Sequence, residues 1–290
     1  MNDQTLTSET IDVAELVDLV ASEAAPPTGT HTQRPFRIPT RHNATLAALL
    51  ERVNADRELF ALWRCANVNS VDRAGRNDHG RVHVQIVANI GLKLLRLLAD
   101  ADIQPSIIRH HGLGQEEAEV VVFLAAVLHD LGIAVHRQDH EQHSLFLAAP
   151  KAKELLEGLY DVEARTIIWA ETLHAIISHN RDVPCLTIEA GVVKVADALD
   201  MCKGRSRIPF QAGQVNIHSL SAAAIERVTL TKGETKPISI VVEMANSAGI
   251  FQIDELLNPK LGNSGLRDYV EVVGTVKVEE EKRMLQVFRI

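Results

Sequence analysis

Apolar and polar positions alternate at helical spacing along most of the chain, from about residue 43 to residue 204. Asn43 precedes the first of these segments and suits a helix N-cap, because its side chain can accept a hydrogen bond from the first turn. Acidic residues open "QEEAEVVVFLAAVLHDLG", as the helix dipole favours. The predicted helices span residues 43–55, 55–67, 77–101, 115–132, 141–159, 161–180 and 189–204.

The pattern changes near residue 205, where β-branched runs and two-residue alternation replace the helical spacing. "KGETKP" (232–237) predicts a turn between two strands, and residues 249–261 predict one helix among them. From residue 225 onward the order is ββαββ, a small α+β domain. The predicted strands span residues 215–219, 225–231, 237–245, 268–279 and 283–290.

The N-terminal segment stands apart from both patterns. Residues 8–24 predict a short amphipathic helix, and "APPTGT" (25–30) ends it. We therefore expect three units: an acidic N-terminal appendage (1–35), a helical domain (36–207) and a C-terminal α+β domain (208–290). The predicted fold class is mainly α. The residues predicted to face inward from the first helix are Ile11, Leu16, Val17 and Val20.

Composition is that of a soluble globular protein, with 46% hydrophobic and 23% charged residues in 290. The net charge is −8, and residues 1–30 hold six acids but no lysine or arginine. The rest of the chain is therefore close to neutral. Without a basic footprint, general nucleic-acid binding is not expected.

The cysteines and the apolar segments indicate the cellular compartment in which the protein is expected. The three cysteines are far apart and form no CxxC pair, which fits a reducing compartment. The N-terminus lacks a basic region of a secretory signal, and "VVVFLAAVL" (120–128) is too short to span a bilayer. We expect a cytoplasmic protein without a membrane partner.

Six histidines and aspartates occur in an ordered series in the helical region, each flanked by apolar residues. Such groups are costly on apolar faces unless they are paired or bind metal. Imidazole and carboxylate together suit Mn, Fe, Zn, Ni or Co rather than Ca. A carboxylate has two oxygens, so Asp130 is the natural bridge between two ions, which could hold a hydroxide and clamp a phosphoryl group. The six candidate ligands are His83, His129, Asp130, His140, His179 and Asp197.

The order H…HD…D, with "HDLG" after an apolar helix, resembles the HD-domain metal-dependent phosphohydrolase superfamily. The resemblance covers residues 75–205. His140 begins H-x-x-x-S with Ser144, where dinuclear members usually have H-x-x-x-G, and His179 ends an "AIISH" segment like theirs. "KGRSRIP", "NIHSLSA" and "NSAGIFQIDELL" resemble an archaeal and bacterial branch. The resemblance implies two divalent transition-metal ions (Mn, Fe, Ni or Zn), with Mg as a further candidate.

One departure concerns the lysine that many relatives carry in "HDIGK". Here Ile133 and Ala134 follow the corresponding glycine. We expect His136 or Arg137, nearly one turn later, to take over the role of that lysine. His79, one turn before His83, is a candidate substrate or outer-shell group. The predicted catalytic residues are therefore Asp130, His79, His136 and Arg137.

Basic residues that follow the last ligand could bind a substrate phosphate, since arginine offers a forked set of donors. Lys203, Arg205 and Arg207 alternate in "KGRSRIPF", and Lys194 lies one turn before Asp197. These four are the predicted substrate-binding residues. Asp200 is expected to pair with a lysine or arginine, and "IIRHHGLG" (107–114) is expected to be a loop.

The resulting hypothesis is hydrolysis of a phosphoester or phosphoanhydride by a metal-bridging hydroxide, in a nucleotide-like small molecule. Two alternatives stay open. The ligand set also resembles the di-iron oxygenases of the superfamily, and the missing lysine would also fit a non-catalytic, metal-stabilised regulatory module. The expected partner is a phosphorylated small molecule, and the C-terminal domain could supply a homo-oligomer interface.

Overall fold

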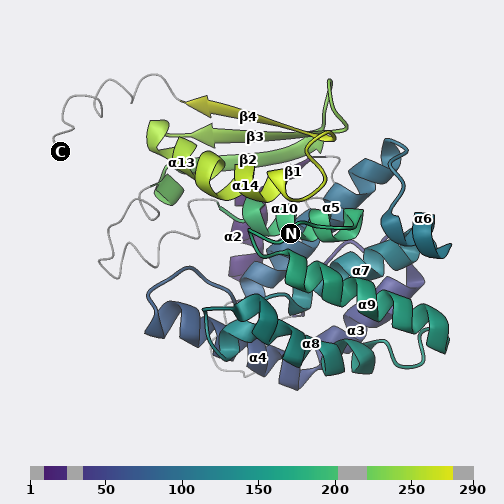
Figure 1. Ribbon diagram of the computed structural model, residues 1–290. Coiled ribbons are helices and arrows are strands. Elements are labelled where there is room, and N and C mark those ends of the chain that lie inside the picture. Colours follow the sequence, from purple (N-terminus) through teal and green to yellow (C-terminus); the bar gives the residue numbers. More distant parts are fainter. Residues whose placement is uncertain (1–9, 25–34, 202–220, 277–290) are drawn as a thin grey trace.

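The computed structural model describes residues 10–24, 35–201 and 221–276, and the predicted helical region forms a bundle of packed helices (Figure 1). All seven helices predicted there are present. They are α3 (Ala44–Ala55), α4 (Arg57–Asn67), α5 (Arg81–Asp100), α7 (Gln115–Leu128), α8 (His140–Leu155), α9 (Val162–Ser178) and α10 (Ile188–Leu199).

Side-chain caps define where several of these helices begin. The Asn43 side chain accepts a hydrogen bond from the Leu46 amide at 2.8 Å, which confirms the predicted cap of α3. Asp56, Asp161 and Thr187 cap α4, α9 and α10 in the same way. Each cap satisfies an N–H group that has no partner within its own helix.

The core is built around α5 and α7. Every residue of α7 from Ala118 to Leu128 is buried, so this helix is enclosed on all sides, as its nearly continuous apolar sequence requires. By length and composition alone α5 could cross a membrane, but 89% of its most apolar window is buried inside the protein. Its hydropathy is that of a central core helix.

The expected loop at 107–114 is corrected by the structure, because Ser106–His111 forms a short helix, α6. The amides of Ser106 and Ile107 donate to the carboxylate of Glu189, at 3.1 and 2.9 Å. The group that completes the N-terminus of α6 is thus about 80 residues away in the sequence. The local sequence pattern therefore could not predict this helix. Two further short elements are the π-helix η1 (Val68–Arg73) and the 3-10 helix η2 (Leu131–Ala134).

The C-terminal part contains the predicted strands β2 (Ile225–Lys232), β3 (Ile238–Met244) and β4 (Val270–Val276). β2 and β3 form an antiparallel hairpin, while β4 pairs with β3 in parallel. A parallel pair needs a crossover, which the predicted helical segment supplies. The crossover consists of η3 (Ser247–Gly249), α13 (Ile250–Gln252), η4 (Ile253–Leu257) and α14 (Asn258–Gly262). The predicted strands at 215–219 and 283–290 lie outside the described residues.

A fourth strand comes from the opposite end of the chain. β1 (Ile11–Asp12) pairs antiparallel with β2, which gives the sheet the order β1-β2-β3-β4. α2 (Val13–Ala24) follows, and it packs against α5 and β2 with Leu16, Val17 and Val20 buried, as predicted. Residues 10–24 are therefore part of the packed body. The expectation of an appendage is wrong for these residues, because the apolar face of α2 packs against α5 and β2. Both partners lie far away in the sequence, so the local pattern could not indicate this contact.

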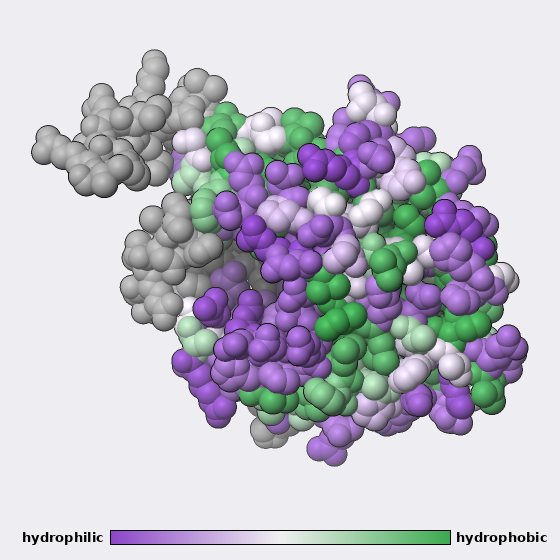
Figure 2. Space-filling model, viewed as in Figure 1, coloured by the Kyte–Doolittle hydropathy of each residue, from purple (hydrophilic) through white to green (hydrophobic). Residues whose placement is uncertain are grey.

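The sheet lies along one side of the helical bundle, at the top of Figure 1, and the crossover elements η4 and α14 contact α10 of the bundle. One contact holds the two parts together closely: a Cβ on Gly191 of α10 would lie 2.2 Å from the carbonyl oxygen of Ser264. The absence of a side chain at Gly191 lets the segment after α14 approach the helix. On the face shown in Figure 2, hydrophilic and hydrophobic residues are interspersed, as is usual for protein surfaces.

Candidate metal centre

All six predicted ligands converge, although they lie in or next to six different elements. Together with His79 and Glu141, these residues form four groups of three, and in each group the three donor atoms lie within 4.8 Å of one another. The helix ends explain this convergence, because most of the six stand at a terminus that faces the same interior point. His83 lies in the first turn of α5, His129 ends α7, Asp130 precedes η2, His140 begins α8, His179 ends α9, and Asp197 lies in the last turn of α10.

Four side chains form the first half of the centre. His83 Nε2 lies 3.2 Å from His129 Nε2, 3.2 Å from Asp197 Oδ1 and 3.2 Å from Asp130 Oδ2. His129 Nε2 is also 3.3 Å from Asp130 Oδ2. Two imidazole nitrogens and two carboxylate oxygens thus surround one point.

The second half of the centre uses the other oxygen of Asp130. His140 Nε2 lies 3.3 Å from Asp130 Oδ1, and His179 Nε2 lies 3.8 Å from the same oxygen. The two Nε2 atoms are 3.3 Å apart. The two oxygens of one buried carboxylate therefore face two separate sets of candidate ligands.

Outer contacts hold each of the four histidines in one orientation. In every case Nδ1 contacts an oxygen, which orients the ring so that Nε2 points inward. Asp200 is one of these acceptors: its Oδ2 bonds His83, a partner that the expected pairing of Asp200 with a lysine or arginine did not include. The acceptors are Asp200 Oδ2 for His83 (2.6 Å), Ala126 O for His129 (2.8 Å), Arg137 O for His140 (3.1 Å) and Ile176 O for His179 (2.5 Å).

The electrostatics of the centre favour a bound cation. Burial opposes the charged form of His129, yet Asp130 and Asp197 outweigh it and raise its pKa to about 9. Against the same effect of burial, neighbouring His129 lowers the pKa of Asp130 and neighbouring Lys260 lowers that of Asp197, both well below the usual range. Both carboxylates thus stay ionised. Nitrogen and oxygen donors of this kind fit divalent transition metals.

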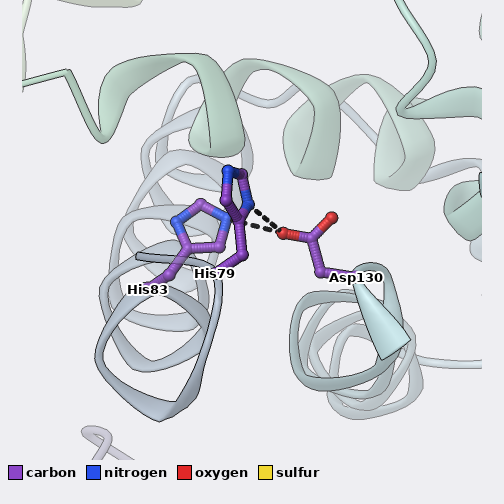
Figure 3. Close-up of side chains that lie close together, drawn as sticks. All are labelled: His79, His83 and Asp130. Atoms are coloured by element: carbon purple, nitrogen blue, oxygen red, sulfur yellow. Dashed lines mark hydrogen bonds and ion pairs between the residues drawn. The ribbon is translucent and has the colours of Figure 1, made fainter. Parts of the chain in front are cut away.

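His79 joins the centre from outside the six predicted ligands. Its Nδ1 lies 2.6 Å from Asp130 Oδ2, and Arg137 Nη1 lies 3.0 Å from its Nε2. In Figure 3, His79 and His83 both approach Asp130, and dashed lines join each ring to the carboxylate. Burial lowers the pKa of His79 to about 3. Because Arg137 can only donate, the neutral ring carries its proton on Nδ1 and donates it to Asp130.

Two predicted site residues lie elsewhere. His136 is exposed, and its Nδ1 accepts a hydrogen bond from the amide of Gln138, so the structure does not bring it into the centre. Lys194 is buried, and its ammonium group donates to the carbonyl of Val183. Neither position fits the role expected for it. Lys203, Arg205 and Arg207 lie outside the described residues.

Sequence reasoning missed two contacts at the centre. Lys260 of α14 donates a hydrogen bond to Asp197 Oδ2, and it comes from the C-terminal part. Ser144 Oγ accepts from the Gly132 amide at 2.8 Å, which explains the serine in H-x-x-x-S. The spacing of Ser144 after His140 could have suggested the second contact. No local pattern could have suggested the first.

This combination of a helical bundle and an ordered His/Asp centre defines a class of proteins. The family model of the HD domain matches residues 82–202. The chain is also 44% identical over 235 residues to Uncharacterized protein MJ1020 of Methanocaldococcus jannaschii, covering 81% of this chain and 90% of that protein. No solved structure gives a significant match. The chain belongs to the HD-domain family, and thereby to the metal-dependent phosphohydrolase superfamily.

Proposed function

We propose that this protein is a metal-dependent phosphohydrolase that cleaves a phosphoester or phosphoanhydride bond of a nucleotide-like small molecule. One observation carries the proposal: Asp130 Oδ2 faces His83 and His129, while Asp130 Oδ1 faces His140 and His179. A carboxylate shared between two ligand sets is what a two-ion phosphoryl-transfer site requires.

The residues divide between two ions of the Mn, Fe, Ni or Zn type, with Mg as a further candidate. His83, His129 and Asp197 would hold one ion, His140 and His179 the other, and Asp130 both. When bound, such ions supply Lewis-acid stabilisation of phosphoryl oxygens and lower the pKa of water. The inward Nε2 atoms and the ionised carboxylates would be their donors, after His129 has released its proton.

His79 and Arg137 form a short chain that ends on Asp130. With a pKa near 3, His79 is neutral at physiological pH, so it does not act there as a general acid. Its hydrogen bond to Asp130 instead fixes the rotation of the bridging carboxylate. Arg137 carries a planar set of five N–H donors, one of which contacts His79, and it is suited to bind a substrate phosphate beside the centre.

Exposure indicates the side from which a substrate reaches the centre. The side chains of His79, Asp197 and His140 are 15%, 14% and 12% exposed, whereas that of His129 is fully buried. The accessible rim therefore includes both ligand sets, and the floor is closed by apolar helices. A compact phosphoryl group can meet both ions, while the remainder of the substrate stays outside.

The test is phosphate release from a panel of nucleotides and phosphoesters by protein loaded with manganese, iron or nickel, with metal content determined by elemental analysis. We expect about two ions per chain and turnover of at least one nucleotide-type substrate. Asp130→Ala should lose the metals and the activity. His136→Ala is the matched control, since His136 is an exposed histidine of the same loop.

The same experiment distinguishes the rival functions. Iron-dependent oxygen consumption without phosphate release would replace the proposal by an oxygenase. Full metal loading with neither activity would favour a regulatory module. Phosphate release that survives Asp130→Ala unchanged would show that this centre does not carry the reaction.

A further inference from the structure

Lys260 brings a positive charge to the centre from outside the matched HD domain. Its ammonium group donates to Asp197 Oδ2, while Asp197 Oδ1 lies 3.2 Å from His83 Nε2. The two oxygens of Asp197 are thus divided between the lysine and the first ligand set. Lys260 therefore stands one carboxylate away from the position of an ion.

Backbone contacts place α14, so the position of Lys260 does not depend on the ion pair alone. The amide of Cys185 donates to the carbonyl of Asn263 at 2.9 Å. The side chain of Asn263 donates in turn to the carbonyl of Arg181 at 3.0 Å. Next to it, Ser264 packs against the bare backbone of Gly191. The segment that follows α14 is thus fastened to the helical bundle at Arg181, Cys185 and Gly191, which positions Lys260 beside Asp197.

Lys260 also lies on the accessible rim. Its side chain is 11% exposed, close to the 14% of Asp197. An ammonium group has three N–H donors, and Asp197 takes one of them. Lys194 is directed to the carbonyl of Val183, so among the described residues Lys260 is the lysine that reaches the centre, on the Asp197 side, while Arg137 approaches through His79.

The charge balance of the centre indicates which kind of ligand Lys260 would bind. Two divalent ions carry four positive charges, and the ligand carboxylates of Asp130 and Asp197 supply two negative ones. A further cation weakens the hold on the metals by repulsion. It strengthens the attraction for an anion bound beside them. A lysine at this position therefore favours the binding of an anionic ligand beside the metal ions.

We propose that Lys260 is a substrate-binding residue that donates to a phosphate oxygen of the substrate, held in place by Asp197. It would take the part that the lysine of "HDIGK" was expected to play, from the opposite end of the chain. This inference rests on the proposed function. It also makes the C-terminal α+β part a component of the active site.

The test is calorimetric binding of inorganic phosphate to the full-length, manganese-loaded protein and to two variants. We expect Lys260→Met to weaken phosphate binding about 10- to 100-fold, the range for a lost hydrogen bond to a charged group, with unchanged metal content. Lys260→Arg should stay within about threefold of the wild type, because it keeps the charge. Lys232→Met, at an exposed lysine of the same part, is the matched control and should bind like the wild type.

Each other outcome is decisive. Equal phosphate affinity of the wild type and Lys260→Met would overturn the inference and leave the proposed function standing. Loss of metal from Lys260→Met would also overturn it, since the lysine would then serve only the ligand Asp197. A wild type that holds metal but binds no phosphate would contradict the proposed function itself, and the inference with it.

Discussion

A Cβ atom on Gly132 would lie 2.1 Å from the carbonyl oxygen of His140, so the two backbones touch. The Gly132 amide also donates to Ser144 Oγ at 2.8 Å. These contacts press the first turn of α8 against η2, which directly follows Asp130. The 3.3 Å separation of His140 Nε2 and Asp130 Oδ1 therefore depends on a residue without a side chain.

Gly132→Ala should separate the second ligand set from the bridge. The new methyl group collides with backbone atoms that cannot rotate away, so α8 must move and His140 with it. We expect metal content, measured by elemental analysis, to fall from about two ions per chain to about one. Gly262→Ala is the control, because a Cβ there meets nothing within 4 Å. Two ions retained by Gly132→Ala would contradict this account of the second site.

Asp200 should control the affinity of the first site without touching an ion. It accepts from His83 Nδ1 at 2.6 Å and so fixes the ring that presents Nε2. Loss of such a partner typically costs about 10- to 100-fold in metal affinity. We expect Asp200→Ala to show this loss in a manganese titration, and Asp200→Asn, which keeps an acceptor oxygen, to show a smaller one. Equal losses in both variants would point to an effect of charge rather than of orientation.

Metal binding should depend on pH through His129, whose pKa in the metal-free protein is about 9. Below that pH the ring is protonated, and it must release the proton before Nε2 can bind an ion. The affinity should therefore rise about tenfold per pH unit between pH 7 and pH 9, from this group alone. Calorimetry in two buffers of different ionisation enthalpy should detect one released proton. An affinity that is constant between pH 7 and 8.5 would refute this.

Removal of metal should lower the thermal stability, because ions bind the folded chain and not the dispersed ligands of the unfolded one. At a free metal concentration 100-fold above Kd, the stabilisation is about 2.7 kcal/mol. For a protein of this size it corresponds to a fall in Tm of several degrees on adding a chelator. Calorimetric melting with and without chelator measures it. Asp130→Ala should show almost no difference between the two conditions.

Leu16→Ala should destabilise the whole protein, since α2 is part of the core. Leu16 is 1% exposed, and truncation of a buried leucine costs about 2–5 kcal/mol. Denaturant unfolding should show this loss in a single transition. Asp18→Ala, on the exposed face of the same helix, is the control and should change the free energy of unfolding by less than about 0.5 kcal/mol. A near-neutral Leu16→Ala would mean that α2 is dispensable.

The sequence was sufficient for every element whose signal is local. The seven long helices and three C-terminal strands follow from periodicity, and Asn43 was recognisable as a cap. The six candidate ligands were recognisable because histidines and aspartates on apolar faces are costly to bury without a partner or a metal. α6 and β1 were not recognisable, since Glu189 completes one and β2 the other, from far away in the chain.

Only the tertiary structure determined which of the candidate site residues contact one another. Residue spacing indicated that Asp130 could bridge, but only the packing of four helix ends gives its two oxygens separate partners. It also turned Lys194 and His136 away from the centre and brought Lys260 to it. The physical reason is that periodicity encodes which face of an element is buried, whereas the neighbour across that face depends on contacts between residues far apart in the chain.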